Sequence, residues 1–176
     1  LTLSITSCEK DLLEKEQYQK EIYLIGAYNR VWTTEVSYSN EEVKTYFTVS
    51  SSGTLALDRD VNVKMKINEE LVDIYNKKYW TVLNEDKYYK SLDTDLYSIP
   101  SLENTVIKHA EGISAEVPVL IKTASLKIDQ SYVIPVEIES TTGYPISESG
   151  YKMLILLKLK NDYSGTYQMS GHTTLE

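Results

Sequence analysis

The sequence has very little cysteine, histidine and glycine. Its one cysteine, Cys8, excludes an internal disulfide and a cysteine-rich zinc site. Two histidines, His109 and His172, are too few for histidine-rich metal chemistry. Seven glycines offer little material for phosphate-cradling loops. We therefore expect no metal and no cofactor.

Basic residues are also scarce. Lysine and arginine total 18 against 26 aspartates and glutamates, which gives a net charge of −8 over 176 residues. A nucleic-acid-binding protein would show a basic face, so we expect no nucleic-acid partner. Apolar residues make up 41% of the chain and charged residues 25%, which is ordinary for a globular domain and too apolar for disorder. The unusual feature is 15 tyrosines against one phenylalanine.

The chain begins with a short apolar run that ends at its only cysteine. Residues 1–8 read LTLSITSC, and charged residues follow at once from Glu9. The run is too short to span a bilayer, which takes about 20 apolar residues. It resembles the end of a bacterial lipoprotein signal peptide, with Ile5 to Cys8 as the lipobox. This resemblance implies cleavage before Cys8 and lipidation of its thiol.

Lipidation of Cys8 would anchor the protein in a membrane. Two acyl chains on the thiol and one on the new amine give stable anchoring, whereas one chain binds membranes only reversibly. The alternative is a buried free cysteine in a first strand. With a lipobox, residues 1–20 are a signal-peptide remnant, the lipobox and a solvated tether.

Most of the remaining chain alternates between apolar and polar residues, which predicts half-buried β-strands. The clearest example is residues 61–67, where Val61, Val63 and Met65 alternate with polar residues. Further strands are expected at residues 20–27, 31–38, 43–49, 105–109, 114–122, 131–139 and 151–160.

The apolar faces of these strands predict one shared core. The residues expected to face it include Val61, Val63, Met65, Ile67, Val136, Ile138, Ile155 and Leu157. The strand at 151–160 is apolar on both faces in its middle, which indicates a central position in a sheet. Trp32, in a β-rich stretch, is expected in the core. Pro118 and Pro135 fall inside strand-like runs, and because proline donates no ladder hydrogen bond we expect edges or bulges there.

One short helix interrupts the strands. Asn68 is the expected N-cap, and Glu69 and Glu70 suit the positive end of the helix dipole. Residues 83–100 read as an ordered loop. About eight short strands separated by turn signals, with one helix, predict an all-β sandwich over residues 21–160. Residues 161–176 read as a linker and the start of a truncated second domain.

Two segments resemble parts of a known family: one is a strand followed by a helix, and the other is a strand followed by a turn. VNVKMKI at residues 61–67 runs into a helix with VDIYN at 72–76, and YVIPVEI at 132–138 is followed by GYPISE at 143–148. With the lipobox, they resemble the N-terminal immunoglobulin-like domain of unknown function in Bacteroidetes surface lipoproteins, whose genes often lie in polysaccharide-utilisation loci. The resemblance covers residues 21–160 and implies an immunoglobulin-like antiparallel β-sandwich and glycan handling at the outer membrane. It carries over no ligand residues.

No catalytic motif stands out. The sequence lacks a serine nucleophile elbow, and a single small sandwich offers no obvious cleft for the two carboxylates of a glycosidase, so we expect no enzyme. Asp58 and Asp60 offer oxygen ligands for calcium, and so do Asp93 and Asp95. Neither pair continues into an EF-hand loop. We interpret both pairs as solvated turn acids.

Aromatic residues gather between Tyr75 and Tyr97. Aromatic faces are good platforms for sugar rings, whose C–H groups pack on them while the hydroxyls bond polar groups nearby. Residues at helical spacing form the apolar stripe of the expected helix: Leu71, Ile74, Tyr75, Lys78 and Tyr79. Trp80, Tyr88 and Tyr89 fall outside this stripe, which makes them the candidate glycan-binding residues. The alternative is that the aromatic residues only pack the helix and its loop onto the sandwich.

These observations favour a non-catalytic module of an outer-membrane surface lipoprotein in glycan capture or utilisation, acting as a spacer or a weak glycan binder. Its expected partners are a glycan or polysaccharide, the outer membrane through the lipid anchor, and other glycan-uptake proteins of the same locus. Two alternatives stay open. The chain is an accessory domain of a larger glycoside hydrolase, or it is a structural adhesin or fimbria-like subunit whose copies exchange strands.

Overall fold

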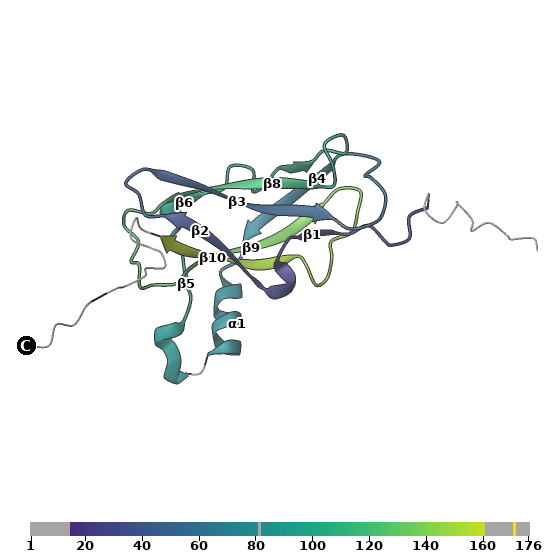
Figure 1. The fold of residues 1–176 in the computed structure, drawn as a ribbon. Coiled ribbons are helices and arrows are strands. Elements are labelled where there is room, and N and C mark those ends of the chain that lie inside the picture. Colours follow the sequence, from purple (N-terminus) through teal and green to yellow (C-terminus); the bar gives the residue numbers. More distant parts are fainter. Residues whose placement is uncertain (1–14, 81, 161–170, 172–176) are drawn as a thin grey trace, which may run out of the picture.

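Two β-sheets stack face to face, with one α-helix below them (Figure 1). The computed structural model describes residues 15–80, 82–160 and 171. The four-stranded sheet has the order β1-β3-β8-β6, built from β1 (Ile22–Leu24), β3 (Glu42–Ser51), β8 (Ser114–Lys122) and β6 (Tyr97–Ser98). The six-stranded sheet has the order β2-β10-β9-β4-β7, built from β2 (Val31–Ser37), β10 (Lys152–Lys160), β9 (Tyr132–Thr141), β4 (Val61–Ile67) and β7 (Thr105–Ile107), and β5 (Lys90–Ser91) also pairs with β9.

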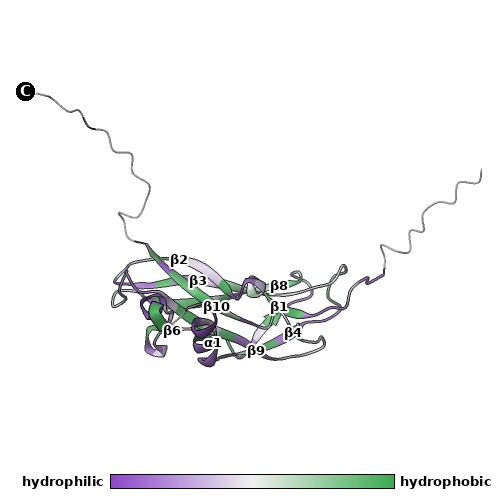
Figure 2. Ribbon diagram, turned by 90° about the horizontal axis from the view of Figure 1, so that it is seen from below, coloured by the Kyte–Doolittle hydropathy of each residue, from purple (hydrophilic) through white to green (hydrophobic). Residues whose placement is uncertain are grey.

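The core lies between the two sheets and follows the alternation in the sequence. In β4, Val61, Val63 and Met65 are buried, whereas Lys64 and Lys66 are exposed. Seven of the eight residues expected to face the core are buried in one apolar cluster, and the eighth, Ile67, is partly buried and packs against it. Figure 2 shows apolar colour along the strands and hydrophilic colour on the helix. The predicted all-β sandwich with one short helix is confirmed.

β10 is central in its sheet, as its two apolar faces predict. It pairs with β2 in parallel and with β9 in antiparallel orientation. Ile155 and Leu157 point into the main core. The opposite face enters a second apolar cluster under the helix, whose buried members are Leu71, Val72, Val133 and Leu154. A strand covered by a sheet on one side and a helix on the other needs apolar residues on both faces.

α1 (Glu70–Tyr79) follows β4 and lies against the outer face of the six-stranded sheet. The structure places the N-cap at Glu69, one residue after the expected Asn68, and the Glu69 side chain makes no capping hydrogen bond. Asn68 still contacts the first turn, because its Oδ1 accepts a hydrogen bond from the Glu70 amide at 3.2 Å. After α1 the chain passes through the 3-10 turn η3 (Val82–Lys87) and returns to the edge of β9 as β5. Among the described residues, no helix has the length and apolar character needed to cross a membrane.

The two prolines that lie inside strands, Pro118 and Pro135, are found where ladder pairing is interrupted. On one edge, β9 pairs with β5 up to Val133 and with β4 from Val136 onward. Pro135 falls in the gap between these two partners, so no ladder hydrogen bond from its nitrogen is missing there. At Pro118, β8 pairs with β3, but its other neighbour β6 pairs only further along the strand. The expected local edges are confirmed.

Trp32 is not in the core, and this sequence-based expectation is wrong. In the register of β2 on β10, Trp32 lies opposite Ile155, yet 38% of its surface is exposed. The reason is that β2 is an edge strand with one neighbour. The indole packs on Gly26, where an added Cβ would lie 2.6 Å from Trp32 Cε3.

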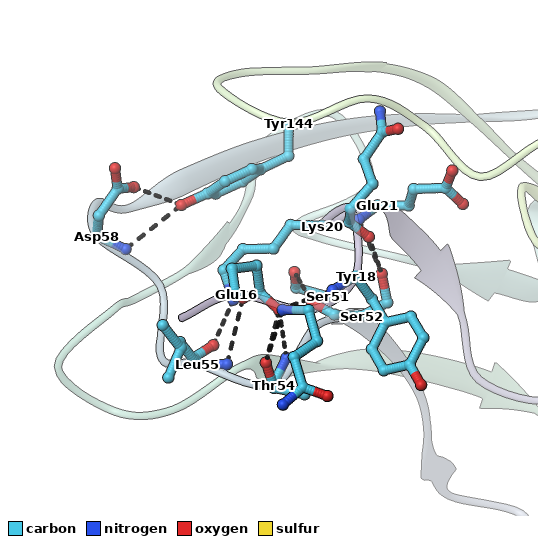
Figure 3. Close-up of polar contacts among 12 residues, drawn as sticks. Glu16, Tyr18, Lys20, Glu21, Ser51, Ser52, Thr54, Leu55, Asp58 and Tyr144 are labelled. Carbon is cyan, nitrogen blue, oxygen red and sulfur yellow. Dashed lines mark hydrogen bonds and ion pairs between the residues drawn. The ribbon is translucent and has the colours of Figure 1, made fainter. Parts of the chain in front are cut away.

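The segment before β1 docks on the loop between β3 and β4 (Figure 3). Glu16 accepts hydrogen bonds from the Thr54 amide at 2.7 Å, the Thr54 hydroxyl at 2.8 Å and the Leu55 amide at 3.2 Å. Lys20 Nζ lies 2.6 Å from its carboxylate. Part of the predicted tether, from Glu16 to Lys20, therefore lies on the sandwich. Cys8 and the lipobox lie outside the described residues.

Candidate functional site

The three aromatic residues predicted to bind glycan, here called the aromatic trio, lie around the end of α1. Trp80 follows the last helical residue and is half-buried, and its Nε1 is buried without a hydrogen-bond partner among the described residues. Lys87 Nζ lies 5.7 Å from the centre of the indole. Tyr88 and Tyr89 are half-buried as well. The trio therefore has less open ring surface for stacking than three fully exposed rings would have.

Tyr89 belongs to a stack of tyrosines on α1. Its ring lies 5.2 Å from that of Tyr75 at an angle of 10°, and Tyr75 lies 4.5 Å from Tyr79 at 34°. Asn76 holds the backbone of Tyr89, donating from Nδ2 to its carbonyl at 2.9 Å and accepting from its amide at 2.9 Å. One face of the Tyr89 ring is thus covered, whereas Tyr79 is 48% exposed. The glycan-binding role of the trio stays a prediction.

A groove of about 320 Å³ lies between α1, the six-stranded sheet and the turn η2 (Ala27–Asn29). We call it the α1–η2 groove. Four of its lining residues, Ala27, Leu71, Met153 and Leu154, are buried. Leu71 and Leu154 belong to the apolar cluster under the helix and give the groove an apolar floor. Its aromatic and charged lining residues are Tyr28, Arg30, Tyr75, Lys78, Glu148 and Lys152. An apolar floor with a few polar groups around it is the usual composition of a small-molecule site.

The α1–η2 groove carries more positive than negative charge. Arg30, Lys78 and Lys152 line it together with one carboxylate, that of Glu148. Tyr75 adds a neutral hydroxyl: burial, and after it the neighbouring Tyr89, raise the pKa of Tyr75 to about 12. The Tyr75 phenol therefore stays protonated at neutral pH, and its hydroxyl remains a potential donor.

Arg30 has an uncommon backbone conformation. Its φ of 64° lies in the left-handed region, and no other non-glycine residue among those described does so. Its amide donates to the Ala27 carbonyl at 2.8 Å, and its carbonyl accepts from the Leu154 amide at 2.8 Å. These two bonds join the turn η2 to β10 and fix where Arg30 leaves the backbone.

Sequence reasoning missed the contribution of η2. Helical spacing placed Tyr75 and Lys78 on one face of α1, but it did not connect them with Tyr28 and Arg30. The two halves meet only because η2 packs on β10, which α1 also contacts. Gly26, with φ of 90°, is the local signal for a turn, but that signal does not say which element the turn faces.

Three of the four acidic residues considered for calcium have side-chain partners in the protein. Asp58 accepts a hydrogen bond from the Tyr144 hydroxyl. Asp60 accepts from the His109 amide at 3.0 Å, and its Oδ1 lies 2.6 Å from His109 Nδ1. Asp93 accepts from the amide two residues on, at 3.2 Å. In the part of the chain that the structure describes, no group of three or more His, Cys, Asp or Glu residues could hold a metal ion.

Comparison with known proteins identifies a family and a set of structural neighbours. A family model described as an N-terminal domain matches residues 18–145. A search of curated proteins found no match. Among solved structures, a multidomain protein including DUF1735 from Bacteroides ovatus is 20% identical, with a TM-score of 0.61 and coverage of 78% of this chain and 43% of that one.

Two further neighbours have descriptions that mention carbohydrate. A candidate carbohydrate binding protein from Bacteroides ovatus is 19% identical, with a TM-score of 0.58 and coverage of 78% of this chain and 36% of that one. EndoBT-3987 with Man5GlcNAc product, from Bacteroides thetaiotaomicron, is 20% identical, with a TM-score of 0.56 and coverage of 78% and 30%. Identity this low shows a shared fold alone.

The chain spans less than half the length of each of these three neighbours. The predicted start of a second domain, residues 161–176, lies outside the described residues apart from residue 171. The family model covers well over half of the chain, and the neighbours share its β-sandwich. The protein therefore belongs to this family of N-terminal domains and has the fold of its Bacteroides neighbours.

Proposed function

We propose that this chain is a non-catalytic module for glycan capture on an outer-membrane surface lipoprotein. The observation that carries the proposal is the α1–η2 groove, where tyrosines and charged side chains surround an apolar floor. Sugar rings combine C–H faces that pack on aromatic rings with hydroxyls that bond polar groups. The groove offers partners for both.

The neighbours support a glycan-related role. One solved protein with this fold is described as a candidate carbohydrate binding protein, and another was solved with a Man5GlcNAc product. In the second protein the shared fold occupies only 30% of the chain. That proportion fits the alternative that this chain is the accessory domain of a larger glycoside hydrolase, in which another domain performs the chemistry.

Glycan capture predicts weak retardation of the protein in native gels that contain polysaccharide. A shallow groove desolvates few groups, so we expect a Kd on the order of millimolar to tens of micromolar. Tyr28 is 62% exposed, so Tyr28→Ala should abolish retardation and change the melting temperature by only about 2 °C. Tyr18, which is 68% exposed and lies outside the groove, provides the control: Tyr18→Ala should behave as wild type. Unretarded migration of the wild-type chain across a broad polysaccharide panel would refute glycan capture.

The same gels distinguish the groove from the aromatic trio. If the trio is the site, Trp80→Ala abolishes retardation while the melting temperature stays unchanged. Because Trp80 is half-buried, we expect the reverse, with retardation preserved and stability lowered by about 1–2 kcal/mol through lost packing. Thermal denaturation followed by circular dichroism, run beside the gels, measures both effects.

A pure spacer is the second candidate, and the path of the chain favours it. Near one end of β3, the Ser52 amide bonds the Glu21 carbonyl at 2.9 Å, and near the other end the Tyr38 amide bonds the Lys160 carbonyl at 2.7 Å. The described chain therefore enters and leaves at opposite ends of the sandwich (Figure 1). A strand of ten residues separates these ends by about 30 Å.

The surface location depends on Cys8. That residue lies outside the described part of the chain, so its lipidation is part of the proposal and rests on the lipobox pattern. A lipid on Cys8 would attach the protein to the outer membrane by the end of the sandwich where Glu16 docks. The other glycan-uptake proteins of the locus would then be its neighbours on the membrane.

A further inference from the structure

We propose that the α1–η2 groove binds an acidic sugar, one that carries a carboxylate or sulfate group. This inference rests on the proposed glycan capture and adds the class of glycan. Three cationic side chains from three separate elements line the groove: Arg30 after η2, Lys78 on α1 and Lys152 in β10. Against these three charges the lining carries one carboxylate, Glu148.

The three cations form no ion pairs within the part of the chain that the structure describes. Among the described residues, no carboxylate oxygen lies within 4.0 Å of Arg30, Lys78 or Lys152. By contrast, Lys64 on the outer face of β4 pairs with Glu139 at 2.7 Å. Lys78 Nζ lies 5.5 Å from the ring centre of Tyr79 and Lys152 Nζ lies 4.8 Å from that of Tyr151, but an aromatic ring does not neutralise the charge. In a chain with 26 acidic and 18 basic residues, three cations without a carboxylate partner leave positive charge available to an anionic ligand. The planar fork of arginine in particular matches the two oxygens of a carboxylate or sulfate.

The backbone of Arg30 supports the same conclusion. A side chain with a Cβ is disfavoured at φ of 64°, and glycine or asparagine would adopt this conformation more easily. The hydrogen bonds to Ala27 and Leu154 hold it there. Strain of this kind persists where the surrounding structure imposes it and is often found at binding sites. The side chain of Arg30, which lines the groove, explains why arginine stands in this turn.

The remaining lining residues indicate a sugar rather than a bare anion. Tyr28 is 62% exposed and Ile74 is 54% exposed, so both keep surface open to pack on the C–H face of a sugar ring. The neutral Tyr75 hydroxyl can donate to a ring substituent, and the Glu148 carboxylate can accept from a sugar hydroxyl. Glu148 also repels a second anionic group placed beside it, which favours one acidic group per bound ring.

Native gels with matched acidic and neutral polysaccharides test this inference. Polygalacturonate and chondroitin sulfate supply acidic sugars, and fully methyl-esterified polygalacturonate removes the charge from the same backbone. We expect retardation by an acidic glycan and none by the neutral counterpart. The double variant Arg30→Gln with Lys78→Gln should weaken binding about tenfold. Lys44→Gln is the matched control. Lys44 lies 5.0 Å from the ring centre of Tyr46, much as Lys78 lies 5.5 Å from that of Tyr79, but it is on the other sheet.

The possible results separate the acidic-sugar inference from the proposed function. Retardation by neutral polysaccharides alone would contradict the preference for acidic sugars but would still support glycan capture. Retardation by polyglutamate as strong as that by the acidic glycans would overturn it too, because charge without a sugar would then be sufficient. No retardation by any polysaccharide removes both proposals. If the double variant loses its circular dichroism signal, the single variant Lys78→Gln replaces it in the gels. A Lys78→Gln variant that binds the acidic glycan as tightly as wild type contradicts the inference.

Discussion

A single carboxylate, that of Glu16, organises the surface where the chain enters the sandwich. It accepts hydrogen bonds from Thr54 and Leu55 and pairs with Lys20 (Figure 3). The hydrogen bond from Lys20 is the largest of the causes that hold the pKa of Glu16 well below its ordinary value of 4.5. Because the folded pKa is the lower one, these contacts stabilise the folded state fully above the unfolded pKa. Their contribution is lost as the pH falls through the folded pKa.

We expect residues 16–20 to stay docked at pH 4 and to release only in stronger acid. Glu16→Gln should remove the charge-assisted bonds at every pH, so that the amides of Thr54 and Leu55 exchange faster at pH 7 than in wild type. Hydrogen exchange measured by NMR at both pH values tests this. Glu35→Gln, which removes a carboxylate on β2 that pairs with Lys158 at 3.6 Å, serves as the control. Unchanged protection of the two amides in Glu16→Gln would mean that other groups hold them.

The degree of burial of the two tryptophans could not be predicted from residue type alone. Both are large and apolar, and composition alone favours burial. Trp32 is 38% exposed because it lies on an edge strand, and Trp80 is half-buried because it ends the helix. The number of neighbours around a side chain depends on where its strand or helix lies in the fold, and the sequence near each tryptophan does not contain that information.

At the scale of elements, long strands were readable from the sequence and short ones were not. β4 and β8 have the bounds that alternation predicts, residues 61–67 and 114–122. β5 and β6, with two residues each, fall inside the expected loop at 83–100. Alternation needs several residues to show a period of two. The two-residue strands exist because β9 and β8 offer them a pairing edge.

The orientation of the core strands leads to a stability prediction. Met65 and Ile155 are each 1% exposed, so Met65→Asp or Ile155→Asp buries an unpaired charge and should cost about 3–5 kcal/mol of unfolding free energy. Asn62 alternates with the core residues of the same strand and is exposed, so Asn62→Asp should cost under about 0.5 kcal/mol. Urea denaturation of the three variants provides the comparison. Near-wild-type stability for either core variant would contradict the assigned faces.

At the scale of the whole molecule, attachment through Cys8 is the prediction with the widest consequence. Expressed from the full gene in a host that lipidates proteins, the wild type should incorporate a clickable fatty acid and fractionate with the outer membrane. Cys8→Ala removes the only cysteine of residues 1–176 and should abolish both, because the lipid is expected to be attached there. Ser7→Ala, which keeps a small residue before the cysteine, is the control and should label normally. Label that persists in Cys8→Ala excludes the lipobox.

The sequence by itself determined the fold class, the long strands, the helix and the residues of the core. Each of these follows from local periodicity, because a half-buried strand or helix repeats its apolar residues at the spacing of its own backbone. Only the tertiary structure decided which elements meet: that η2 lies beside α1, that Arg30 and Lys78 line one groove, and that Glu16 docks on the loop after β3. Such contacts join residues far apart in the chain, and no local pattern records them, because sheet order and the packing of the layers bring them together.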